Sequence, residues 1–199
     1  MMKELCAMVI VATGMLVVPT VSADCVPVKQ EERDYRDDAL RVAKIQNAVA
    51  VIGNPEYLSN DQACVVAAIR YLGVHRVKSA IPRLVELLSY RVEPEEPLQS
   101  KPTVGRIYPA MGALFQIGND ALPSLIKVIA DRDNEDVSSK NALFTLMSIY
   151  HSKGKGVRAL TEASTKQTDP QAAVHLERAA EEARSTWCKD EVQCSDETN

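Results

Sequence analysis

The sequence predicts an all-α protein, a short α-solenoid of about three helical hairpins with a capping helix at each end. Three observations lead to this prediction. Apolar residues recur at helical spacing through most of the chain, strand-like alternation is nearly absent, and a segment the size of one hairpin is repeated. A single hairpin cannot bury its own apolar stripe, so the copies are expected to stack on a shared core.

Helices are expected between breaks rich in glycine and proline. Ser59 and Gln62 resemble a capping box that opens the second helix, and Gly73 is expected to close it. A proline-rich acidic loop over 92–101 and a glycine turn over 154–156 interrupt the pattern, and Asp169-Pro170 is a good helix start. The expected helices cover 30–52, 61–72, 80–90, 103–117, 121–130, 135–150, 157–166 and 170–186.

The repeat is visible as a self-match. Residues 79–84 read S-A-I-P-R-L and residues 120–125 read D-A-L-P-S-L, an offset of 41. Ser79 and Asp120 are expected to be N-caps. Pro82 and Pro123 then fall in the first helical turn, where a missing N–H costs little. A degraded third copy aligns Leu160 with the leucine that ends each of these motifs.

Residues 67–88, A-A-I-R-Y-L-G-V-H-R-V-K-S-A-I-P-R-L-V-E-L-L, resemble the HEAT repeat, including the PBS-lyase HEAT-like repeats. The resemblance is strong over 61–89, good over 107–130 and weak over 134–166. It implies a solenoid whose outer helices, 30–52 and 170–186, act as caps. It also implies protein binding as the usual role, and it carries over no catalytic residues.

The N-terminal segment, 1–23, is predicted to be a secretory signal peptide. Its apolar run, Cys6–Val18, is too short to span a bilayer, and Val21-Ser22-Ala23 suits signal peptidase. Retention as an anchor stays open, whereas Asp24 disfavours lipid attachment at Cys25. The expected product is exported, to the bacterial periplasm or beyond the cell, without a stable membrane span. Its parts are a tail (24–29), the HEAT-like domain (30–187) and a polar tail (188–199).

Four cysteines remain after cleavage, an even number that predicts two disulfides in an oxidising compartment. Cys188 and Cys194 flank a short polar loop and are the first choice for one bridge. The second would then join Cys25 to Cys64, although other connectivities stay open. A metal site is disfavoured because no CxxC pair is present and no histidine is near the cysteines in sequence.

The remaining composition points away from catalysis. A net charge of −4 without a basic tract disfavours nucleic acid as a partner. The chain contains no HExxH, GxSxG or complete phosphate loop, and a flexible basic turn accounts for 153–156. Solvated turn positions account for His75 and His151, and His175 has no partner pattern. We therefore expect no enzyme activity, cofactor or metal.

The second helix of each hairpin lines the concave side of a HEAT-like stack. This places the predicted protein-binding residues on three helices, with charges of mixed sign, which favours a polypeptide partner or pairing within the chain. The expected function is a binding or structural scaffold. The alternative is an accessory or lyase-like subunit that acts on a cofactor-bearing partner protein. The predicted protein-binding residues are Arg83, Glu86, Tyr90, Lys127 and Glu162.

Overall fold

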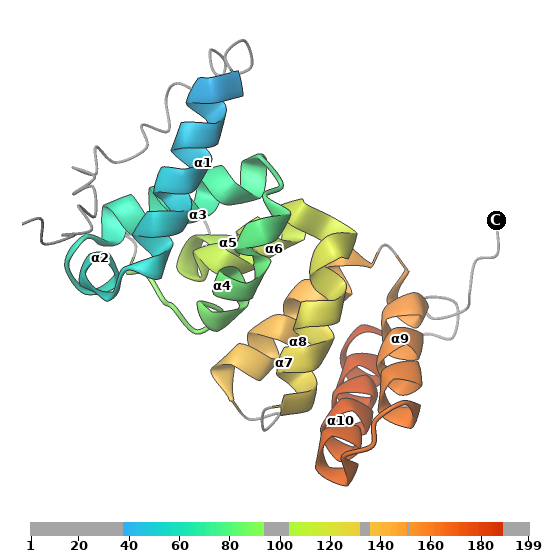
Figure 1. Cartoon of the computed structure of the whole chain (residues 1–199). Coiled ribbons are helices and arrows are strands. Elements are labelled where there is room, and N and C mark those ends of the chain that lie inside the picture. Colours follow the sequence, from blue (N-terminus) through green and yellow to red (C-terminus); the bar gives the residue numbers. More distant parts are fainter. Residues whose placement is uncertain (1–37, 94–103, 132–135, 151, 189–199) are drawn as a thin grey trace, which may run out of the picture.

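The computed structural model describes residues 38–93, 104–131, 136–150 and 152–188 (Figure 1). Throughout these residues the secondary structure is helical, with turns and no strand, so the predicted all-α class is confirmed. The predicted signal segment, the N-terminal tail, the C-terminal tail after Cys188 and most of the proline-rich loop lie outside the described residues. The α-helices are α1 (Asp38–Gly53), α2 (Pro55–Asn60), α3 (Gln62–Val74), α4 (Ile81–Glu86), α5 (Val104–Ile107), α6 (Pro109–Ile117), α7 (Leu122–Asp131), α8 (Val137–Ile149), α9 (Lys153–Thr165) and α10 (Pro170–Trp187).

Short acidic or amide side chains start several of these helices. Asp169 accepts a hydrogen bond from the Gln171 N–H at 2.9 Å, so the predicted start of α10 is confirmed. The predicted capping box is wrong, because Asp61 is the N-cap of α3 and accepts from the Cys64 N–H at 2.9 Å. Ser59 belongs to the short helix α2 instead, and its hydroxyl donates to the Pro55 carbonyl oxygen.

The two N-caps predicted from the repeat are also wrong. A 3₁₀ turn precedes each helix, η3 (Lys78–Ala80) before α4 and η4 (Gly118–Ala121) before α7. Ser79 lies within η3, and Asp120 lies within η4, where its carboxylate forms an ion pair with Lys78 at 3.0 Å. Pro82 does fall in the first turn of α4, as predicted.

Two glycines that were expected to end helices behave differently. Gly118 ends α6 with a φ of 79°, a conformation that glycine adopts without strain, so this prediction is confirmed. The prediction for Gly73 is wrong, because α3 continues to Val74 and Gly73 lies buried against α6. A Cβ at Gly73 would lie 2.6 Å from the Ala113 Cα. Gly73 therefore permits two helices to approach closely.

The predicted glycine turn over 154–156 is wrong as well, because these residues form the first turn of α9. Gly156 is buried, and a Cβ there would lie 2.6 Å from the Met147 Sδ. The Lys153 ammonium donates to the Met147 carbonyl oxygen at 2.6 Å. The close contact of Gly156 with α8 explains why a glycine stands at this position. Gly156 therefore marks close helix packing and not a flexible turn.

The helices pack in two connected rows (Figure 1). In the first row α3 packs against α1 and α6, and α6 also contacts α8. In the second row α7 packs against α4 and α10. The rows share one core, to which seven helices each contribute one fully buried leucine. These leucines are Leu72, Leu84, Leu114, Leu125, Leu146, Leu160 and Leu176.

The last two helices depart from the expected arrangement. The weak third repeat predicted α8 and α9 as a hairpin, with α10 as an outer cap. Instead α9 packs mainly on α10, and α10 lies between α9 and α7. Consistent with this position, α10 buries Leu176 and four alanines, more than a solvent-facing cap would bury.

We predict that Gly73→Ala destabilises the protein by roughly 1–3 kcal/mol, because the new methyl group must push α3 away from the backbone of α6. Gly53→Ala is the matched control. Gly53 is also helical, and a Cβ there meets no atom within 4 Å, so the change should be neutral or slightly stabilising. Chemical denaturation of both variants measures the difference. Equal stabilities would contradict the close-packing role of Gly73.

Candidate binding site

The predicted protein-binding residues do not form one row. Arg83 and Glu86 lie on α4, and Lys127 lies on α7, which contacts α4. Glu162 is exposed on α9, which packs on α10. The helix that packs beside α7 is α10, not α9. Glu162 on α9 therefore does not extend the row formed by α4 and α7.

Two of these residues have partners within the chain. The Arg83 Nε donates to the Ile52 carbonyl oxygen at 2.8 Å, which ties α4 to the end of α1, and the Arg83 guanidinium also pairs with Glu86. Tyr90 is partly buried against the core, and burial and then the Asp61 carboxylate raise the pKa of its phenol. The mixed charges of the predicted site allowed either a polypeptide partner or pairing within the chain. The ion pair between Arg83 and Glu86 is an example of pairing within the chain.

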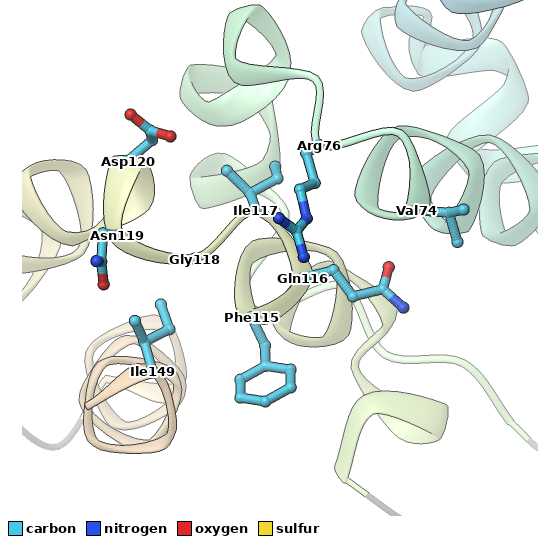
Figure 2. Close-up of a pocket in the computed structure, with 9 residues that line it drawn as sticks. All are labelled: Val74, Arg76, Phe115, Gln116, Ile117, Gly118, Asn119, Asp120 and Ile149. Atoms are coloured by element: carbon cyan, nitrogen blue, oxygen red, sulfur yellow. The ribbon is translucent and has the colours of Figure 1, made fainter. Parts of the chain in front are cut away.

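A groove lies instead at the edge where the C-terminal ends of three first-row helices meet (Figure 2). Its volume is about 690 Å³, which is within the range of ligand-binding clefts. Residues from α3, α6 and α8, and from the turns after α3 and α6, contribute to it. The lining residues are Val74, Arg76, Phe115, Gln116, Ile117, Gly118, Asn119, Asp120 and Ile149.

The groove combines apolar side chains with polar groups in about equal share. Ile117 and Ile149 are buried, whereas Phe115 is 53% exposed. Val74, at the end of α3, is also exposed. The groove therefore presents both apolar side chains and hydrogen-bonding groups to another molecule.

Arg76 occupies a strained position at the rim. Its N–H donates to the Gly73 carbonyl oxygen at 2.9 Å, and the Val77 N–H donates to the Leu72 carbonyl oxygen at 3.0 Å. This is the Schellman pattern, in which glycine usually occupies the left-handed position. Arg76 has a φ of 50°, which costs a residue with a side chain about 1 kcal/mol.

The charges around the groove are unevenly paired. Asp120 is neutralised by Lys78 at 3.0 Å. Figure 2 shows the Arg76 side chain extending toward the end of α6, whereas the Asp120 carboxylate points away from it. Within the part of the chain that the structure describes, Arg76 makes no ion pair. The lining of the groove therefore includes a guanidinium group and an exposed aromatic ring.

The sequence analysis missed both Arg76 and Phe115. The repeat itself carried one signal, because its offset of 41 aligns Phe115 with Val74, and both are exposed apolar residues at the ends of successive helices. Nothing in the sequence marked Arg76. Its importance depends on a left-handed backbone conformation, and arginine does not predict that conformation.

The histidines contribute little to this site. His75 stacks on the Tyr71 ring, with the ring centroids 4.2 Å apart, and it does not line the groove. His175 is buried, and its Nδ1 lies 3.0 Å from the Ala130 carbonyl oxygen, which ties α10 to α7. His151 lies outside the described residues. Among those described, no cluster of three or more histidine, cysteine or acidic side chains could hold a metal ion.

Of the four cysteines predicted to pair, the structure describes Cys64, buried in the first turn of α3, and Cys188, directly after α10. Neither is a free thiol, and they are not bonded to each other. Cys25 and Cys194 lie outside the described residues, so the pairing of Cys25 with Cys64 and of Cys188 with Cys194 stays a prediction.

We predict that Arg83→Ala destabilises the protein by about 1–3 kcal/mol, because it leaves the partly buried Ile52 carbonyl without its charged donor. Glu86→Ala removes only the exposed side of the ion pair and should cost less than about 1 kcal/mol. Urea denaturation of the two variants separates these effects. An equal loss in both would show that the ion pair, and not the bond to α1, is the important interaction.

We predict that the mature protein, analysed by mass spectrometry without reductant, begins at Asp24 and lacks two hydrogen atoms for each of two disulfides. Peptide mapping of the same sample should then show which cysteines are joined. A mass that matches four free thiols would contradict the pairing, and a retained residue 1 would contradict cleavage.

No helix among the described residues is long and apolar enough to cross a bilayer. Comparison of the chain with models of protein families, with curated proteins and with solved structures gives no match.

Proposed function

We propose that the protein is an exported, non-enzymatic scaffold that binds a polypeptide, built as a short stack of HEAT-like hairpins. The observation that carries the proposal is the groove at the ends of α3, α6 and α8, with Phe115 exposed at its edge. Aromatic side chains that project beside a preformed hollow are typical anchors of protein–protein contacts.

The packing of the helices supports a stack of this kind. The ends of α3, α6 and α8 line one groove, so the three helices end at the same edge of the domain. The second-row helices α4 and α7 also contact each other. Successive hairpins in a solenoid have this relation, and their ends form a continuous surface across several repeats.

The chemistry of the groove suits recognition. Its apolar side chains can cover a partner's apolar residues, while Gln116, Asn119 and the backbone of the turns can exchange hydrogen bonds with a peptide. Export is supported by the apolar segment before residue 24 and by two described cysteines that are not free thiols. In this proposal the partner is another protein of the same compartment.

The proposal predicts that a photo-crosslinking amino acid at position 115 captures a discrete protein when the full chain is expressed with its leader in a bacterial host. Val137 is the matched control position, because it is 47% exposed but lies at the opposite end of α8 from the groove. We expect crosslinking at 115 and not at 137. Capture at 137 alone, or at neither position, would count against the groove as the binding site.

A further inference from the structure

We infer that the groove selects a peptide segment that carries a carboxylate next to apolar side chains, with Arg76 as the residue that recognises the carboxylate. This inference rests on the proposed function and specifies the ligand of the same site. Three observations carry it: the strained backbone of Arg76, the absence of an ion pair between its guanidinium and any described residue, and the exposed apolar side chains in the same groove.

The backbone observation concerns the choice of residue. The Schellman turn after α3 has its left-handed position at Arg76, where helix ends of this kind normally have glycine. The other described residue of positive φ, Gly118 at the end of α6, is a glycine. A residue held in an unfavourable conformation points to a role for its side chain, because glycine would satisfy the same backbone hydrogen bonds without strain.

The charge observation identifies the ligand. Asp120 is the only acidic residue among those lining the groove, and it is already paired with Lys78, which leaves the Arg76 guanidinium as the cation available to an incoming group. A guanidinium binds a carboxylate through two parallel hydrogen bonds. The exposed Phe115 ring and the Ile117 and Ile149 side chains would then cover the apolar neighbours of that carboxylate.

A competing explanation is structural. The C-terminal end of α3 carries a partial negative charge, and a cation beside it stabilises the helix. In that case Arg76 would contribute to stability and would have no ligand. The two explanations predict opposite effects on stability when Arg76 is replaced by glycine.

The test uses the full mature protein and an array of short peptides in which leucine and phenylalanine flank one variable residue, Asp, Asn or Lys. Fluorescence anisotropy then gives Kd for the best Asp peptide and its Asn twin. We expect the Asp peptide to bind roughly tenfold more tightly, as for a charge-assisted hydrogen bond over a neutral one. Arg76→Gly should abolish this preference while raising the denaturation midpoint.

Two further variants sharpen the test. Arg76→Lys keeps the charge but loses the two-pronged geometry, so it should retain only part of the preference. Phe115→Ser should weaken the binding of the Asp and Asn peptides equally and leave the ratio of their Kd values unchanged, because it removes only an apolar contact.

Equal binding of the Asp and Asn peptides, or a preference that survives Arg76→Gly, would overturn the inference. A lower denaturation midpoint for Arg76→Gly would favour the structural explanation and would therefore count against the inference. If no peptide binds but position 115 still crosslinks to a protein, the carboxylate inference fails while the proposed function stands. If neither occurs, both fail.

Discussion

The close contact between α3 and α6 is the constraint on which the rest of the structure depends. Gly73 has no side chain, and the Ala113 backbone occupies the space where a Cβ would lie. This contact holds the two helices at short distance, so their C-terminal ends lie side by side. The turn containing Arg76, the η4 turn and the end of α8 then meet around one hollow. A larger residue at 73 would separate these parts.

Each of the two helix ends at the groove contains a residue of positive φ, but the two turns differ. At Gly118 the residue suits its positive φ, and nothing else is gained. At Arg76 a Schellman turn directs a long cationic side chain toward the end of α6, at a cost in conformational energy. Lys78 and Asp120 join the two turns across the edge of the domain. This exposed ion pair contributes little to stability. Among the described residues that line the groove, it leaves Arg76 as the charged side chain without an ion pair.

Helical periodicity predicted most of the helices but missed the short helix α2, and most of the other errors concern helix ends. Gly73 and Gly156 looked like helix breakers in the sequence, yet both lie within helices at points of close packing. Ser79 and Asp120 looked like N-caps, yet a 3₁₀ turn takes that place. In each case the residue type marked a special position in the chain, but the role of that position depended on the surrounding structure. Local propensity cannot distinguish a glycine that ends a helix from one that another helix touches.

The sequence by itself determined the helical class, the positions of most helices and the apolar face of each, because these follow from spacing along one chain. Only the tertiary structure decided which faces meet. It placed α10 beside α7, engaged Arg83 with the Ile52 carbonyl and brought Phe115 and Arg76 to one groove. The physical reason is that apolar burial is not directional: a stripe of leucines and alanines shows that a helix needs a partner, without specifying which one.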